Sequence, residues 1–257
     1  MNVRTIAGAA ASVASRLVMV GIVAGIWELC ARTGMVDAKL LPSFTDTMVR
    51  LWHQVADPAV RLHLLLTSAE VLLALVISIP LGAAVGILVA ENRYWGDVLR
   101  PLLYFPMSMP KSVFLPLFVL LLGITLTEKV AFGVFSTVFI IVMSTATAIE
   151  SVLPNHVMVA KSCGATRMQI ISRVYVPSML PLLLEGVRLA MIFDLTGILI
   201  AEMYGARSGI GYLITSWGDS FAIGDLLAGI LLVSFVAILF NEAIRGLEHV
   251  FGSWRTT

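Results

Sequence analysis

The sequence predicts an all-α protein that crosses a membrane about six times. Three observations support this fold class: 59% of the 257 residues are hydrophobic, only 13% are charged, and the apolar residues gather in long runs. A soluble domain carries about 25% charged residues, and its surface-to-volume ratio would leave much of this apolar area in water. Lipid is therefore the predicted solvent for the excess apolar surface.

Two of the apolar runs, residues 71–90 and 130–149, contain no charged residue over twenty positions. That length is enough to span a bilayer as a helix. A helix is expected because it satisfies every backbone N–H and C=O group within its own segment. The six predicted spans are residues 12–30, 62–90, 101–127, 130–149, 180–204 and 226–247.

The third span is irregular, because Lys111 interrupts it and Pro106, Pro110 and Pro116 remove backbone donors. Pro80 lies in the second span. Two interpretations stay open for these prolines. They introduce simple kinks, or they mark a broken helix that lines a transport pathway, where non-helical backbone is tolerated.

The lysines and arginines favour an orientation with both termini in the cytoplasm. In that orientation nine of the 17, including Arg4, Arg16 and Arg255, flank the cytoplasmic ends, and six flank the other ends. The remaining two, Lys111 and Arg188, lie within spans. Cytoplasmic loops carry an excess of Lys and Arg.

The net charge of +1 argues against a nucleic-acid partner.

Two loops are too long to be simple turns. In the outer loop, residues 32–61, Ser43 is placed to cap a short helix carrying Met48, Val49 and Trp52. Such a helix suits the membrane interface, where tryptophan is enriched. The cytoplasmic loop, residues 150–177, contains two short helical segments instead of one.

The first of these segments covers residues 157–163, and Asn155 is placed to cap it. Gly164 is predicted to end it, because glycine adopts the left-handed conformation of a helix stop. A second helix begins near Thr166. Pro177 and Pro181 are predicted to bend the start of the fifth span. The result is an elbow, helix–glycine–helix, which another protein could contact.

This elbow resembles the cytoplasmic signature of ATP-binding-cassette (ABC) importer permeases: Glu-Ala-Ala, three residues, Gly, nine residues, then Ile-x-Leu-Pro. Ala160, Gly164 and Pro177 match at the required spacing, and Met158 stands where that family has glutamate. Gly164-Ala165-Thr166-Arg167 is similar to the family's Gly-Ala-Ser-Arg. The loss of the glutamate removes one charge contact but leaves the elbow.

Further matches resemble the nitrate/sulfonate/taurine branch of that family. They are Gly186-Val187-Arg188-Leu189-Ala190, Ala201-Glu202-Met203-Tyr204-Gly205, Ser208-Gly209-Ile210-Gly211-Tyr212-Leu213-Ile214, Trp27-Glu28 and Leu41-Pro42-Ser43. One departure is Glu70, where relatives often carry arginine. The resemblance implies the fold of a type I ABC importer permease, formed as one domain over residues 1–257. It also implies a bacterial inner membrane.

The resemblance further implies that the elbow is a coupling helix that docks on a separate ATPase. The matching positions are Val157, Met158, Ala160, Lys161, Gly164, Ala165, Arg167 and Pro177. No Gly-x-x-x-x-Gly-Lys-Ser/Thr loop occurs in the chain, so if ATP drives transport, a partner is expected to hydrolyse it. The implied assembly has two ATP-binding subunits, a periplasmic or lipoprotein substrate-binding protein and a second permease, usually a second copy of the same chain. The chain itself is not expected to be an enzyme.

The implied substrate is a small anion such as a sulfonate, taurine or nitrate, or an aromatic or vitamin-precursor molecule. Ionisable residues in spans usually face the bundle interior or a pathway, which makes Glu70, Asp194 and Glu202 candidates for the substrate path. Interhelical pairing is the other interpretation, and Glu202 is expected to stabilise the outer gate.

An alternative function is proton-coupled secondary transport through Asp194 or Glu70.

The glycines at 205, 209 and 211 are expected to form a tight turn, and the four histidines (53, 63, 156 and 249) to be solvated. The two cysteines suggest neither a disulfide nor a metal site, and no cofactor is predicted.

Overall fold

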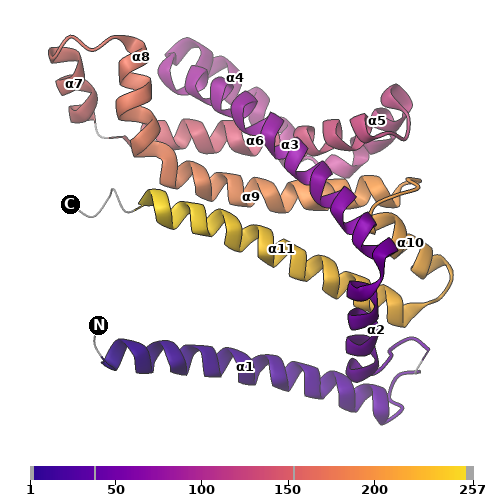
Figure 1. The fold of residues 1–257 in the computed structure, drawn as a ribbon. Coiled ribbons are helices and arrows are strands. Elements are labelled where there is room, and N and C mark those ends of the chain that lie inside the picture. Colours follow the sequence, from indigo (N-terminus) through magenta and orange to yellow (C-terminus); the bar gives the residue numbers. More distant parts are fainter. Residues whose placement is uncertain (1–2, 38, 153, 253–257) are drawn as a thin grey trace. The chain divides into compact units, whose positions relative to one another are not determined.

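The protein is described by a computed structural model that covers residues 3–37, 39–152 and 154–252. Within these residues every regular element is a helix and no strand occurs (Figure 1). This confirms the predicted all-α class. Arg255, counted among the cytoplasmic charges, and Leu153, at the start of the elbow, lie outside the described residues.

The described chain forms two compact units. The first contains α1 (Val3–Arg32), α2 (Phe44–Ala56), the first turn of α3, and the adjoining parts of α10 and α11 up to residue 232. Its short helix α2 confirms the capping prediction, because the Ser43 hydroxyl accepts a hydrogen bond from the Asp46 amide at 3.1 Å. That bond satisfies one of the four unpaired amides at the helix start.

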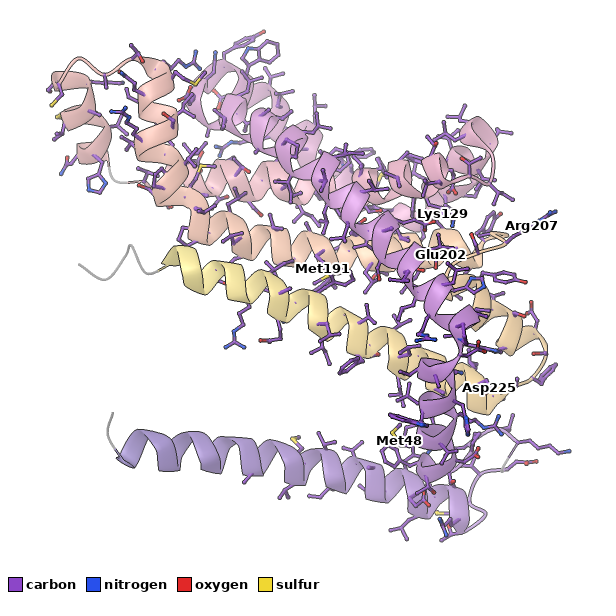
Figure 2. The ribbon with its side chains drawn as sticks, in the orientation of Figure 1. Met48, Lys129, Met191, Glu202, Arg207 and Asp225 are labelled. Atoms are coloured by element: carbon purple, nitrogen blue, oxygen red, sulfur yellow. The ribbon has the colours of Figure 1, made fainter. Side chains whose placement is uncertain are left out.

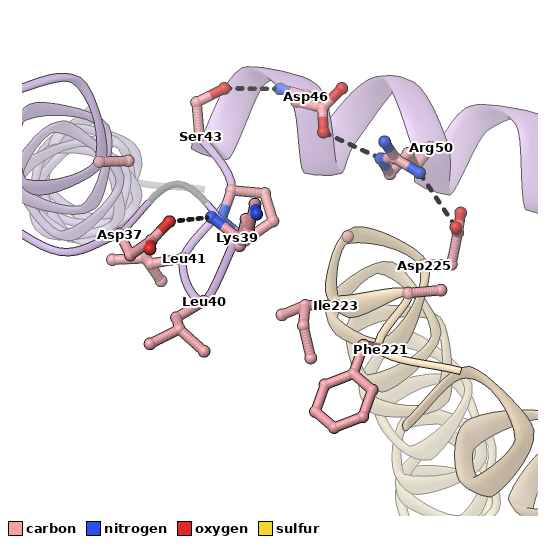
Figure 3. A pocket seen from close by; sticks show the side chains of 14 residues that line it. Asp37, Lys39, Leu40, Leu41, Ser43, Asp46, Arg50, Phe221, Ile223 and Asp225 are labelled. Atoms are coloured by element: carbon pink, nitrogen blue, oxygen red, sulfur yellow. Dashed lines mark hydrogen bonds and ion pairs between the residues drawn. The ribbon is translucent and has the colours of Figure 1, made fainter. Parts of the chain in front are cut away.

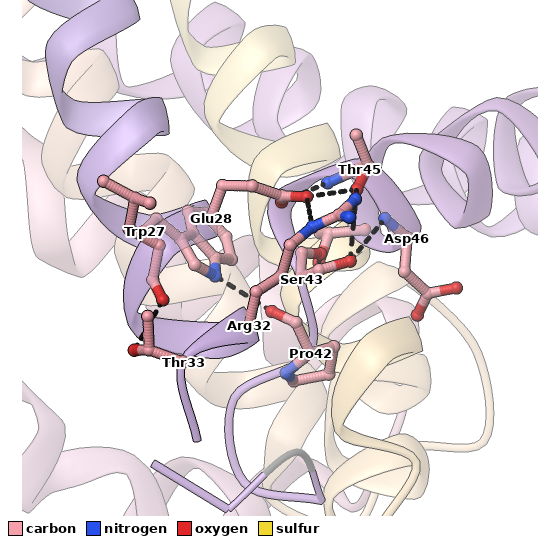
Figure 4. A network of polar contacts seen from close by, with 10 residues as sticks. Trp27, Glu28, Arg32, Thr33, Pro42, Ser43, Thr45 and Asp46 are labelled. Atoms are coloured by element: carbon pink, nitrogen blue, oxygen red, sulfur yellow. Dashed lines mark hydrogen bonds and ion pairs between the residues drawn. The ribbon is translucent and has the colours of Figure 1, made fainter. Parts of the chain in front are cut away.

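Two N-terminal motifs that are separate in sequence contact each other in this unit (Figure 4). The indole Nε1 of Trp27 donates to the carbonyl of Pro42 at 2.9 Å. Glu28 accepts from the amide and the hydroxyl of Thr45, at 3.1 and 2.7 Å, and pairs with Arg32. The end of α1 is therefore tied to the start of α2 by hydrogen bonds.

The second unit holds the remaining elements. They are most of α3 (Pro58–Glu91), α4 (Arg93–Ser108), η1 (Lys111–Phe114), α5 (Leu115–Leu122), α6 (Leu126–Glu150), α7 (Pro154–Ser162), α8 (Arg167–Ile170), η2 (Ile171–Tyr175), α9 (Val176–Met203), the start of α10 (Ile210–Asp219) and α11 (Ile223–Gly252) from residue 233 onward. Helices α6 and α9 run side by side (Figure 1). The largest apolar cluster joins α3 to α9 through Val71, Leu75, Met191 and Ile198.

Three described helices, α3, α6 and α11, are long and apolar enough to cross a membrane. In α6, 61% of the most apolar stretch is buried, against 33% in α3 and 22% in α11. Helix α6 therefore lies in the interior of its unit, while α3 and α11 leave broad apolar faces exposed, as lipid-facing helices do. The predicted count of six spans is not established by these helices and stays a prediction.

The third predicted span is broken, not merely kinked. Residues 94–108 and 111–122 form two helical parts at an angle of 89°, separated at Met109 and Pro110. If this pair is one bent span, the described residues hold four candidate spans. Pro110 favours a break at this position, because it has no backbone N–H and disfavours helical geometry at the preceding residue. Pro80, in contrast, lies inside the continuous helix α3.

Candidate functional site

The predicted elbow forms a pair of short helices around a glycine. Helix α7 ends at Ser162, and Gly164 has a φ of 74°, in the left-handed region expected of it. Thr166 begins α8 with a complete capping box, because its hydroxyl accepts from the amide of Gln169 and the Gln169 side chain accepts from the amide of Thr166. The elbow is therefore encoded by its own local sequence.

One detail of this prediction is wrong. Helix α7 begins at Pro154, so Asn155 lies inside its first turn and does not cap it. Proline suits this position because the first N–H groups of a helix have no partner within the helix. The N–H that proline lacks would therefore be unpaired in any case. After α8 the chain continues through the π-helical turn η2 directly into α9, whose first turn contains Pro177. The helix of the fifth span therefore begins at Val176, earlier than predicted.

The elbow is held to the end of α3 by one arginine. Arg167 donates from Nε and Nη2 to Oε2 of Glu91, at 2.9 and 2.5 Å. These residues line an open pocket of about 600 Å³ together with Val157, Lys161 and Tyr175. Burial, and secondarily the charge of Glu91, raises the pKa of Tyr175, so its hydroxyl stays neutral and available as a donor.

The outer face of the elbow is apolar. Met158, Val159 and Met168 have exposed fractions of 64%, 62% and 72%. Among the predicted coupling residues, Lys161, Gly164, Arg167 and Pro177 are also exposed, whereas Val157, Ala160 and Ala165 are half-buried. The elbow thus presents an apolar tip with basic residues beside it, a composition suited to protein contact.

A second candidate site is a buried polar cluster formed by His63, Thr67, Glu70, Lys129 and Glu202. Nζ of Lys129 on α6 donates to Oε1 of Glu70 on α3 at 2.6 Å and to the carbonyl of Ser208 at 3.4 Å. Both charged side chains are at most 5% exposed. Glu70 is therefore one half of an interhelical ion pair, the second of the two interpretations that the sequence left open.

The cluster also fixes the turn after α9, where Gly205 and Gly209 have positive φ values of 95° and 104°. The Glu202 carboxylate accepts from the hydroxyl of Thr67 at 2.6 Å and from the amide of Gly211 at 2.7 Å. Thr67 in turn accepts from the amide of Ile210 at 2.9 Å. Glu202 therefore stabilises the turn that follows its own helix. Figure 2 labels Glu202 and Lys129, which both belong to this cluster.

His63 completes this arrangement. Its Nδ1 accepts from the amide of Gly209 at 2.9 Å, and its ring lies 5.9 Å from that of Tyr212. The prediction that all four histidines are solvated is therefore wrong for His63. Sequence reasoning also missed Thr67 and Lys129. A signal was present, because positions 63, 67 and 70 recur at helical spacing and share one face of α3.

Asp194 is the third predicted path residue, and it is completely buried on α9 without a hydrogen-bond partner for either oxygen. A β-carbon on Gly133 of α6 would lie 2.5 Å from its Oδ1. Asp194, Glu70 and Glu202 do not form one site: the other two belong to the polar cluster, whereas Asp194 faces α6 by itself.

The first unit has an open pocket of about 830 Å³, lined by apolar and charged side chains from residues 31–50 and 221–225 (Figure 3). Arg50 bridges Asp46 at 2.9 Å and Asp225 at 3.0 Å. The hydrogen bond with Asp46 is the main reason why the pKa of Arg50 is raised. The described residues contain no cluster of three or more side chains suited to hold a metal ion.

The all-helical fold and the glycine elbow define a class of membrane transport subunit, and comparisons with known proteins agree. The chain belongs to the family of binding-protein-dependent transport system inner membrane components, whose sequence model matches residues 78–253.

Two relatives match most of the chain. The formylaminopyrimidine transport permease protein ThiX of Halalkalibacterium halodurans is 31% identical over 90% of this chain and 91% of its own length. The taurine transport system permease protein TauC of Escherichia coli is 26% identical over 89% of this chain and 85% of its own. A solved structure of the MetNI methionine ABC transporter, in an inward-facing conformation, is 16% identical over 82% of this chain and 98% of that chain, with a TM-score of 0.59.

The chain is therefore an ABC importer permease subunit with a type I importer fold, a transport component of the inner membrane. Membership of this family implies partnership with an ATPase and a substrate-binding protein. The nitrate/sulfonate/taurine resemblance is confirmed at the level of relatives, since a taurine permease is among them. Proton-coupled secondary transport is not favoured by any of these findings.

Proposed function

We propose that this chain forms the substrate path of an ATP-driven importer and receives force from a separate ATPase through its elbow. Two copies of the chain, two ATPase subunits and an external binding protein make up the assembly. Closure of the ATPase pair on ATP moves the two elbows, and the path between the permeases opens to the outside. Hydrolysis then returns the path to its inward-facing state.

The observation that carries this proposal is the shape and surface of the elbow. Its two helices are short and joined at Gly164, the second begins with a capping box at Thr166, and its tip exposes Met158, Val159 and Met168. Arg167 connects it to the end of α3, and η2 connects it to α9. A push on the elbow would therefore reach two long helices of the permease directly.

The proposed orientation places both termini and the elbow in the cytoplasm, and the polar cluster near the external surface. Glu202, Thr67 and the turn at residues 205–211 then form part of the outer gate. The proposed cargo is a small organic molecule, because TauC is named for taurine and ThiX for formylaminopyrimidine.

The test is a Gly164→Leu variant assayed for ATPase association and for ATP-driven uptake in proteoliposomes. Gly164 has a positive φ with open space around its Cα, so leucine imposes backbone strain without a clash. Gly34→Leu is the matched control, since Gly34 has a φ of 72° and open space as well, but lies in the loop between α1 and α2. Loss of both activities in Gly164→Leu alone supports the proposal. Unchanged association and uptake in that variant would contradict it.

A further inference from the structure

A small pocket lies beside the break between α4 and η1. It has a volume of about 190 Å³ and is lined by residues of the break, of α6 and of α9, among them Met109, Lys111, Ser136, Phe193 and Thr196. Pockets for drug-sized ligands range from about 300 to 1,000 Å³. This pocket therefore suits a small molecule or one end of a larger one.

The pocket contains a cation with no anionic partner. Lys111 Nζ lies 4.9 Å from the ring centroid of Phe193, and none of the ion pairs between described residues includes Lys111. An aromatic face attracts an ammonium but does not neutralise its charge. A charged side chain within a membrane segment is costly and marks a functional site by default. Lys111 consequently lacks the counter-ion that its position calls for.

The lining of the pocket also includes an unused hydroxyl. Ser136 on α6 is 2% exposed, and its Oγ has no hydrogen-bond partner. A β-carbon at Gly197 on α9 would lie 2.9 Å from that oxygen, so the glycine keeps the space beside the hydroxyl open. Thr196 adds a second hydroxyl, which donates to the Ile192 carbonyl at 2.8 Å. A buried polar atom without a partner calls for an explanation, and a bound water or ion is one of those available.

We propose that this pocket binds the anionic group of the transported molecule, a sulfonate or a similar small oxyanion, with Lys111 as its counter-ion and Ser136 as a hydrogen-bond donor. Met107, Met109 and Phe132 form the apolar wall for the carbon part of the substrate. The pocket lies at the broken helix, where backbone at membrane depth borders a pathway. This inference rests on the proposed transport function and narrows its substrate to an organic anion.

The first test measures binding on the full chain in lipid nanodiscs. The chain has four lysines, at 39, 111, 129 and 161, and the rate at which a small amine reagent modifies each is followed by mass spectrometry. Methanesulfonate is expected to slow modification of Lys111, while Lys39 and Lys161 react as before. Dimethyl sulfone, which has a similar shape and no charge, is expected to leave Lys111 unprotected. No protection by methanesulfonate, or equal protection by the sulfone, would overturn the assignment.

The second test uses the assembled transporter in proteoliposomes with labelled taurine as probe. Lys111→Met is expected to lower uptake about tenfold, the effect of losing one charge-assisted hydrogen bond. Lys111→Arg is expected to keep most of it, and Ser136→Ala to lower it less than Lys111→Met does. Co-purification of the ATPase with each variant shows whether the complex still assembles.

These outcomes distinguish a failure of the pocket assignment from a failure of the proposed transport function. ATP-driven taurine uptake that is unchanged in an assembled Lys111→Met complex overturns the pocket assignment and leaves the transport function standing. Uptake of a neutral aminopyrimidine, with no inhibition by sulfonates, also overturns it. If methanesulfonate still protects Lys111 but the wild-type complex neither takes up these molecules nor hydrolyses ATP in response to the binding protein, the transport proposal fails and only anion binding at this pocket remains.

Discussion

Gly209 lies so close to the carboxylate of Glu202 that any β-carbon at position 209 would overlap it. Position 209 also has a φ of 104°, which L-residues rarely adopt. Two independent reasons therefore require glycine there. The same carboxylate accepts hydrogen bonds from Thr67 and the Gly211 amide, so a displaced Glu202 would release the whole turn after α9.

Gly209→Ala is accordingly expected to lower the thermal unfolding midpoint of the purified protein and to abolish uptake. The strain alone costs about 1–2 kcal/mol, and the unsatisfied buried carboxylate adds to it. Gly218→Ala is the control, because a β-carbon at Gly218 meets nothing within 4 Å. A Gly209→Ala protein as stable as the Gly218→Ala protein would show that the turn is not held as described.

The buried pair of Lys129 and Glu70 gives a second prediction. Lys129→Met is expected to destabilise the protein by about 3–5 kcal/mol, because it leaves the charge of Glu70 buried and unpaired. The double variant Lys129→Met/Glu70→Leu is expected to recover much of that loss. Thermal or denaturant unfolding in detergent measures both effects.

An exposed ion pair serves as the comparison for that experiment. Arg245 and Glu242 lie 3.4 Å apart on α11 with more than half of each side chain exposed. Arg245→Gln is expected to change stability by only about 0–1 kcal/mol. Similar losses in Lys129→Met and Arg245→Gln would argue against a buried pair.

The exposed apolar tip of the elbow gives a third prediction. Val159→Asp is expected to weaken association with the ATPase by about tenfold or more, because a carboxylate placed in an apolar contact loses its hydration without gaining a partner. Association is measured by the amount of ATPase that co-purifies with the permease. Met35→Asp, at a position 78% exposed in the loop between α1 and α2, is expected to bind the ATPase as the unaltered chain does. Equal binding by both variants would contradict a docking role for the tip.

The contact between Arg167 and Glu91 gives a fourth prediction, which concerns coupling rather than assembly. Arg167→Gln removes the link between the elbow and α3. The ATPase is expected to bind as before, because the apolar tip is intact, but its stimulation by the binding protein and the uptake rate are expected to fall together. A variant in which ATP hydrolysis and uptake both stay normal would show that α3 does not transmit the motion.

The sequence by itself determined the class of fold, the elbow and the short helix α2. Each depends on signals carried by neighbouring residues: uncharged runs of twenty residues, the left-handed preference of Gly164, and the hydroxyl cap at Ser43. Such signals act within a few residues and can be interpreted without knowing what the segment packs against. The errors in this part are local as well: the cap assigned to Asn155 concerns a single turn, and the helix of the fifth span begins a few residues earlier than predicted.

Only the tertiary structure decided which charged groups act together. Glu70 and Lys129 are 59 positions apart, and Thr67 and Glu202 are 135 apart. Their pairing depends on which faces of α3, α6 and α9 meet, and helix periodicity does not specify this because each of these helices is apolar on most sides. The break at Pro110 and the pocket beside it depend on packing for the same reason. A proline removes one backbone donor, but the neighbouring helices determine whether the helix kinks or breaks at that position.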